Sequence, residues 1–145
     1  MDLEVQPDSA FGSALPLEES LLADVSAVDG VRVAEGQVVA DGIQPITADD
    51  TAITTAGPPL LGFSWIEDPA LNSFTIEEGR APEAGLEFSI DRGAAAEHGL
   101  AIGETYGVIT PGGRVEMTLV GISRFGEDNA TLGAVLTQYP LETAQ

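Results

Sequence analysis

The stretch that decides the fold begins with GRAP at residues 79–82, continues with AAAEHGLAIGE at 94–104 and ends with VGI at 120–122. Glycine recurs there at points where a chain turns sharply or approaches another segment closely, because a residue without Cβ adopts positive φ at little cost. We expect a short helix that ends at a glycine, a tight turn into a hairpin, and a strand through VGI. These residue types belong to a scaffold. They favour a domain that holds, contacts or transmits movement over one that breaks bonds.

A compact helix is predicted at residues 92–98. Asp91 is a typical N-cap, because its carboxylate can accept hydrogen bonds from the first turn. Gly99 suits the position that ends the helix, with Leu100 packing behind it. A bulge or bend is expected near Gly121, because the apolar residues change face there. Strands are predicted around this helix at residues 74–76, 87–90, 105–110, 115–122 and 134–137.

The first part of the chain predicts a strand, a helix and a second strand. Residues 3–6 alternate in polarity, as in a strand. Apolar residues recur at near-helical spacing through residues 15–29, with Pro16 in the first turn and Gly30 after the end. Residues 31–39 then alternate as a second strand. Shorter strands are expected at residues 43–46 and 52–55, and the start of a last helix at 141–145.

This order of elements favours the α+β class. We expect a βαβ-like part and, next to it, a β-rich subdomain that carries one short helix. At 145 residues with 43% hydrophobic residues, the chain is long enough for one domain with its own core.

The charge balance excludes several classes of partner. There are 24 acidic residues against five arginines and no lysine, which gives a net charge of −19. Such a surface repels the phosphates of nucleic acids and the anionic headgroups of membranes. The chain has no cysteine, so disulfides, thiolate metal sites and thiol nucleophiles are excluded together.

Candidate catalytic groups are few. His98 is the only histidine, and a hydrolase would pair it with Asp91 and Ser89. The predicted helix places Asp91 at its first end and His98 at its last, where a protonated imidazole complements the helix dipole. We therefore interpret the chain as a non-enzyme, without predicted catalytic residues.

Metal and cofactor sites are not predicted either. Adjacent carboxylates such as Glu77-Glu78 do not converge on a cleft as acid–base catalysis requires. Asp49-Asp50 and Glu127-Asp128-Asn129 could offer oxygen ligands to Ca²⁺, but neither has the spacing of an EF-hand loop. No glycine-rich phosphate-binding motif occurs.

The segment 60–65, LLGFSW, contains the only tryptophan and reads as an apolar loop after two prolines. Leu61, Phe63 and Trp65 are candidates for a contact with a partner. The alternative is ordinary core packing. The exposure of Trp65 separates the two interpretations.

Taken together, these motifs resemble the MacB-like periplasmic core domain of FtsX-type ABC transporter permeases. In that family a strand and a helix precede a Gly-Val step, a Gly-Arg-x-Pro element, a strand with a short alanine-containing helix, a Gly-Leu-x-x-Gly-Asp turn and a Val-x-Gly-Ile strand. Glu104 replaces the usual aspartate, and the chain ends where the family pattern continues through a helix and a strand. The matching pieces are residues 3–6, 16–28, 29–31, 79–82, 87–96, 99–104 and 119–122.

The resemblance implies a single extracytoplasmic domain over residues 1–145. Residues 1–50 and 132–145 would form its membrane-proximal part, and residues 51–131 its β-rich distal part. It also implies a place at the extracytoplasmic face of the cell membrane, as a piece of a membrane protein. Its partners would be an ABC ATPase subunit, the permease's membrane helices and an extracytoplasmic protein or lipoprotein.

In this interpretation the domain binds a substrate or partner and transmits ATP-driven conformational change. Arg80 would make a charge-assisted bond to a carboxylate or to backbone carbonyls, which holds its segment in place. The alternative is a secreted binding or adhesion module, in which Ca²⁺ could take part. The residues predicted to shape the turns and hold the segments are Gly79, Arg80, Pro82, Gly99, Gly103 and Gly121.

Overall fold

The computed structural model describes residues 3–5, 17–127, 129 and 131–144. Contacts within the chain divide it into two compact units, Met1–Gly36 and Gln37–Gln145. The second unit contains every strand of the described residues. Each unit is described by itself.

The first unit contains one short helix, α1 (Leu21–Ser26), and none of its residues is buried. The predicted helix at 15–29 is therefore too long at both ends, although residues 15 and 16 lie outside the described part. The strands predicted at 3–6 and 31–39 are also wrong: residues 3–5 and 31–38 form no strand, and Gln6 lies outside the described part. Leu22 and Val28 remain exposed. A periodic apolar pattern without a surface to bury it stabilises little helix.

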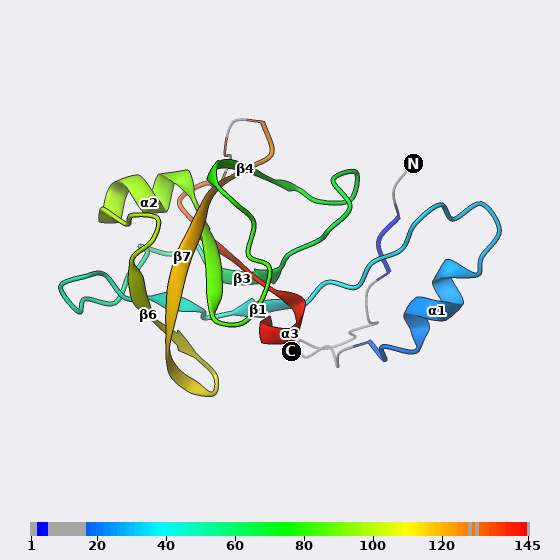
Figure 1. Cartoon of the computed structure of the whole chain (residues 1–145), viewed down its shortest axis with the longest axis horizontal. Coiled ribbons are helices and arrows are strands. Elements are labelled where there is room, and N and C mark those ends of the chain that lie inside the picture. The colour runs from blue at the N-terminus through cyan, green and yellow to red at the C-terminus, as the bar shows by residue number, and fades with distance from the viewer. Residues whose placement is uncertain (1–2, 6–16, 128, 130, 145) are drawn as a thin grey trace. The chain divides into compact units, whose positions relative to one another are not determined.

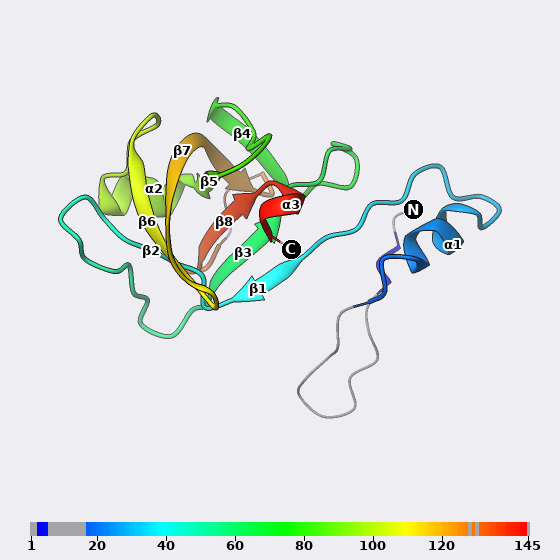
Figure 2. The same cartoon turned by 60° about the horizontal axis from the view of Figure 1, so that its bottom comes forward.

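The second unit is built on one eight-stranded sheet (Figures 1 and 2). The strands follow the order β1-β3-β8-β5-β7-β6-β2, and β4 pairs with β7 beside this path. The pairs β3/β8 and β5/β7 are parallel, and the others are antiparallel. Its elements are β1 (Val39–Asp41), β2 (Gln44–Pro45), β3 (Leu60–Ser64), β4 (Phe74–Gly79), β5 (Glu87–Asp91), α2 (Arg92–His98), β6 (Thr105–Thr110), β7 (Gly113–Phe125), β8 (Val135–Tyr139) and α3 (Leu141–Ala144).

The fold class is mainly β, a curled sheet with three short helices among the described residues, so the predicted α+β class with a βαβ-like part is wrong. The reason lies in β7, which is 13 residues long and pairs with β4, β5 and β6. A strand with three partners gathers the apolar residues into one sheet, and this leaves little surface for helices to cover.

The bend predicted near Gly121 is confirmed. Along β5, Phe88 pairs with Leu119 and the next residue, Ser89, pairs with Gly121, so Val120 is the extra residue of a bulge. The bulge lets β7 curl from β6 toward β4, as Figure 1 shows for the strand that crosses the middle of this unit.

Two apolar clusters lie in this unit. The main cluster contains Phe88, Ile90, Val108 and Leu119, all 0% exposed, together with residues of α2. The smaller one, which we call the aromatic cluster, has Phe74, Ala134 and Leu136 at its centre. Its half-buried members are Leu61, Phe63, Trp65 and Phe125.

The helix predicted at 92–98 is confirmed as α2. Asp91 is its N-cap and accepts a hydrogen bond from the Ala94 N–H. Gly99 ends it in the left-handed region at φ +66°, and Leu100 is buried behind it. The loop predicted at 60–65 is instead strand β3, because residues 60–64 pair with β1 on one side and β8 on the other.

Candidate functional site

The crossing of β4 and β7 is the place where the predicted residues meet. Gly79 pairs with Gly121 in the register of these strands. A Cβ on Gly79 would lie 2.2 Å from the Val120 carbonyl oxygen, and one on Gly121 would lie 2.1 Å from the Arg80 carbonyl oxygen. Gly79 also has φ +71°. Only glycine allows the two backbones to approach this closely. We call residues 79–80 and 120–121 the glycine crossing.

Hydrogen bonds extend the crossing on both sides. The Arg80 N–H donates to the Val120 carbonyl at 2.9 Å. Leu119 precedes Val120 in β7. The Leu119 N–H donates to the Glu104 carbonyl oxygen at 3.0 Å, and the Leu119 carbonyl oxygen accepts from the Gly103 N–H at 2.8 Å. Gly103 has φ +94°, so the turn before β6 depends on it. The glycine crossing and the 99–104 turn are thus joined through β7.

Arg80 holds the segment that follows the crossing. Its guanidinium donates to both carboxylate oxygens of Glu87, at 2.6 and 2.9 Å, and to the Ala81 carbonyl. Glu87 also accepts from the Glu83 N–H at 3.0 Å. These bonds, the one from Arg80 first, lower the pKa of Glu87 to about 2. Pro82 lies fully buried inside this loop.

Leu61, Phe63 and Trp65 lie on the aromatic cluster. All three are half-buried and pack against its centre, with the ring of Phe63 5.1 Å from that of Phe74. Trp65 is neither enclosed in a core nor freely exposed, so these residues have both a packing role and an accessible side.

The residues considered for hydrolysis have structural partners. Asp91 is 1% exposed, and its two carboxylate oxygens accept from the Ala94 and Leu136 N–H groups, each at 3.0 Å. Ser89 donates to the Gln138 side-chain oxygen at 2.6 Å. His98 is the last residue of α2, about 10 Å along the helix from its cap. The structure does not bring the three side chains together.

A buried polar network beside the aromatic cluster was missed by the sequence analysis. The side-chain amide oxygen of Gln138 accepts from the hydroxyls of both Ser89 and Ser123, and all three residues are 0% exposed. They come from β8, β5 and β7, so their meeting depends on strand order. The alternation of Ser89 and Asp91 with the buried Phe88 and Ile90 is the signal that could have revealed a polar face of β5.

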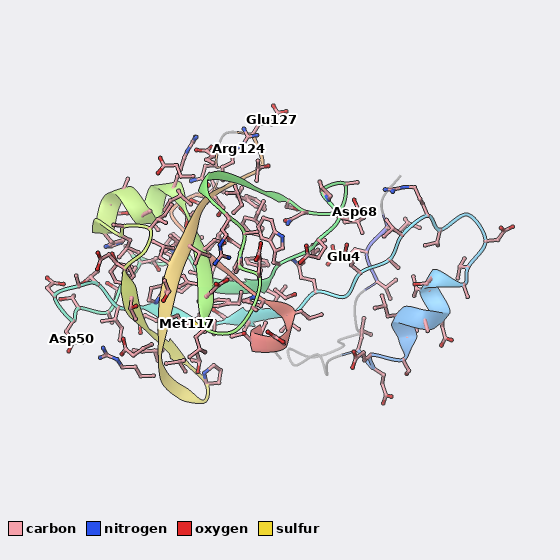
Figure 3. All side chains as sticks on the ribbon, viewed as in Figure 1. Glu4, Asp50, Asp68, Met117, Arg124 and Glu127 are labelled. Carbon is pink, nitrogen blue, oxygen red and sulfur yellow. The ribbon has the colours of Figure 1, made fainter. Side chains whose placement is uncertain are left out.

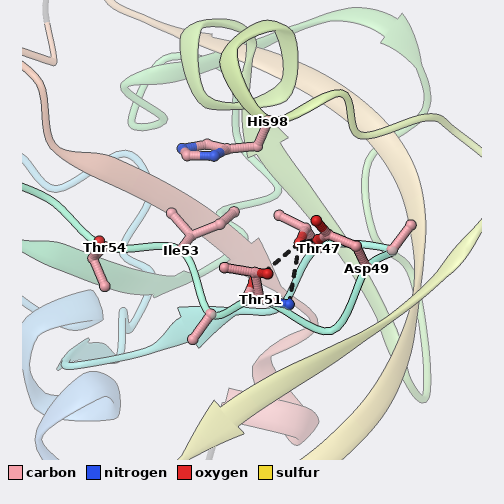
Figure 4. Close-up of a pocket in the computed structure, with 8 residues that line it drawn as sticks. Thr47, Asp49, Thr51, Ile53, Thr54 and His98 are labelled. Carbon is pink, nitrogen blue, oxygen red and sulfur yellow. Dashed lines mark hydrogen bonds between the residues drawn. The ribbon is translucent and has the colours of Figure 1, made fainter.

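His98 lies over an open groove of about 470 Å³ (Figure 4). The other side of the groove is the segment 47–54. Thr47 donates to Asp49 and to the Thr51 carbonyl, and accepts from the Thr51 N–H. The bond from Thr47 lowers the pKa of Asp49. The hydroxyl of Thr47 and the carboxylate of Asp49, which line the groove, are therefore hydrogen-bonded within the turn at residues 47–51.

The candidate calcium ligands are dispersed. Figure 3 shows Asp50 and Glu127 in separate regions of this unit, and Asp50 accepts from Arg114 at 2.8 Å. Asp128 lies outside the described residues. Within the part of the chain that the structure describes, no three His, Cys, Asp or Glu side chains group as metal ligands would. In the same part, no helix is long and apolar enough to span a membrane.

No family model matches the chain, and no curated protein matches it significantly.

Proposed function

We propose that the chain is a non-catalytic extracytoplasmic domain of an ABC transporter permease, which binds a partner protein or substrate and transmits ATP-driven conformational change. The proposal rests on the motifs that resemble MacB-like domains of FtsX-type permeases. The observation that carries it is the contact among them. Four of the matching pieces, at residues 79–82, 87–96, 99–104 and 119–122, are joined around the glycine crossing.

This arrangement suits the transmission of movement. The pieces are held by backbone bonds, by two glycines in mutual contact and by the Arg80–Glu87 pair. We therefore expect them to move as one body. A body that does not deform passes on a displacement applied at one end. The ABC ATPase and the permease's membrane helices would supply that displacement. A partner protein or lipoprotein outside the membrane would receive it.

The full-length protein tests the assignment. We expect its sequence to contain four or more hydrophobic membrane spans, and its ATPase to copurify with it. A full-length protein without such spans contradicts the proposal.

Reconstituted full-length protein tests the mechanical part. At a temperature where circular dichroism shows the Gly121→Ala domain to be folded, this substitution is expected to reduce coupling between ATP hydrolysis and the transport or activation step, while binding of the ATPase is retained. The matched control is Gly112→Ala, where the nearest atom to the new Cβ is 3.7 Å away. Equal coupling in both variants contradicts a role for the glycine crossing in transmission.

A further inference from the structure

The free edge of β1 is where the structure offers backbone groups to another chain. Among the described residues β1 has one neighbouring strand, β3, and so ends the sheet (Figure 2). The Ser64 N–H donates to the Val38 carbonyl, and the Gly42 N–H donates to the Leu60 carbonyl. In an antiparallel pair the bonded residues alternate, so the backbone groups of Val39 and Asp41 point away from β3. A strand added there would find its donors and acceptors already aligned.

Three apolar side chains and one carboxylate lie beside this edge. Val39 pairs with Phe63, and Asp41 pairs with Leu61. All four lie on the face of the sheet that carries the aromatic cluster, because the opposite face of β3 at Gly62 meets Ile43 and Tyr139 of the main cluster. Val39 is 55% exposed, and Leu61 and Phe63 are half-buried. We call Val39, Asp41, Leu61 and Phe63 the β1 edge surface.

The negative charge of the protein indicates which kind of peptide segment would bind to the β1 edge surface. The protein has a net charge of −19, and Asp41 stands exposed within the edge itself. An extended segment with lysine or arginine at alternate positions gains from this field, whereas an acidic segment is repelled. Apolar residues at the remaining positions would cover Val39 and Phe63.

We propose that the β1 edge surface binds an extended, basic segment of a partner protein, which adds a strand to the sheet with its apolar side chains over Val39 and Phe63. This inference names the partner class for the proposed function and rests on it for the expectation that a protein partner exists. The binding itself depends only on the edge, the apolar surface and the charge.

The experiment uses the whole ¹⁵N-labelled chain and a synthetic peptide of about ten residues with alternating valine and lysine. We expect the largest amide shifts at residues 39–41 and 61–63, and exchange of the Val39 and Asp41 amide protons about tenfold slower in the saturated complex. The dissociation constant should rise with NaCl concentration. A peptide of alternating valine and glutamate is the matched control and should not bind.

Variants locate the surface. Val39→Ser and Asp41→Lys are each expected to weaken binding about tenfold, since the first removes the apolar contact and the second removes the favourable charge. Ile109→Ser is the matched control, because Ile109 is an exposed apolar residue of β6, near the opposite end of the strand order. Unchanged melting temperatures establish that all three variants fold.

Several results would overturn the inference. They are the absence of shifts at β1, shifts centred on another strand, or equal binding of the acidic peptide. Slow exchange of Val39 and Asp41 in the free chain would show an edge already paired. Self-association through β1 without peptide would assign the edge to a second copy. None of these results bears on the membrane spans of the full-length protein, so this inference and the proposed function fail separately.

Discussion

The glycine crossing and the β1 edge surface differ in how the backbone groups of one sheet are hydrogen-bonded. At the crossing, β7 is paired on both sides and two glycines bring the backbones together without side chains between them. At the edge, β1 pairs only with β3 among the residues that the structure describes, and the exposed Val39 lies beside backbone groups that point away from β3. The first region fixes the position of its neighbours, whereas the second remains available to another molecule.

The difference teaches where substitutions should matter. A close backbone approach has no room to adjust, so it should govern stability. An exposed edge has room on one side, so its residues should govern binding with little effect on folding.

The largest effect is expected for Gly121→Ala. The added Cβ would lie 2.1 Å from the Arg80 carbonyl oxygen, and this contact can be relieved only by moving one backbone. We expect the free energy of unfolding to fall by about 3 kcal/mol or more. Urea denaturation measures it, with Gly112→Ala as the control that should change little. Equal free energies of unfolding for Gly121→Ala and Gly112→Ala would contradict the claim that the close backbone approach governs stability.

Asp91→Ala should come second. The substitution removes the cap of α2 and leaves the Ala94 and Leu136 N–H groups buried without acceptors. We expect a loss of about 2 kcal/mol in the free energy of unfolding, measured in urea. Asp91→Asn keeps the shape but replaces one acceptor oxygen by a donor, so it should lie between Ala and the natural residue. A neutral Asp91→Ala would mean that β5, α2 and β8 are not held together by this carboxylate.

A smaller, pH-dependent effect is expected at the Arg80–Glu87 pair. The folded protein lowers the pKa of Glu87 from 4.5 to about 2, mainly through the bond from Arg80. Because the folded pKa is the lower one, the stabilisation is complete above the unfolded pKa and disappears as the pH falls from about 4.5 to about 2. The stability difference between the natural chain and Glu87→Gln should therefore shrink over this range. A difference that is constant with pH contradicts the ion pair.

The smallest effect on folding is expected at the edge. Val39→Ser replaces an apolar side chain that is already 55% exposed. Its free energy of unfolding should remain within about 0.5 kcal/mol of the natural chain. Thermal unfolding measures this, and a loss comparable with that of Gly121→Ala would show that β1 belongs to the stable part of the sheet.

The local chemistry of the second unit could be predicted from the sequence. Asp91 and Gly99 mark the ends of α2 because capping depends on residues within one turn. The change of apolar face near Gly121 indicated the bulge, because the alternation of side chains along a strand is also a local property of the sequence. A charge-assisted bond from Arg80 to a carboxylate or to backbone carbonyls was expected, but Glu87 could not be named because the loop between them determines which acid is near.

The sheet itself could not be predicted in the same way. The segment 60–65 has the composition of an apolar loop after Pro58-Pro59, and only its pairing with β1 and β8 makes it a strand. In the first unit, the helical spacing through residues 15–29 indicated more helix than forms, because none of the six residues of α1 is buried. In both segments, contacts with residues distant in the sequence determine the secondary structure. Local sequence patterns do not reveal these contacts.

Amide hydrogen exchange of the whole chain, read residue by residue, compares the two regions in one experiment. The account predicts slow exchange at Arg80, Gly103 and Leu119 and fast exchange at Val39 and Asp41, with the inward-facing Gly42 and Ser64 slower than the two edge residues. Fast exchange at Arg80 and Leu119, or protection of Val39 and Asp41 equal to theirs, would contradict the division of this sheet into a fixed crossing and an open edge.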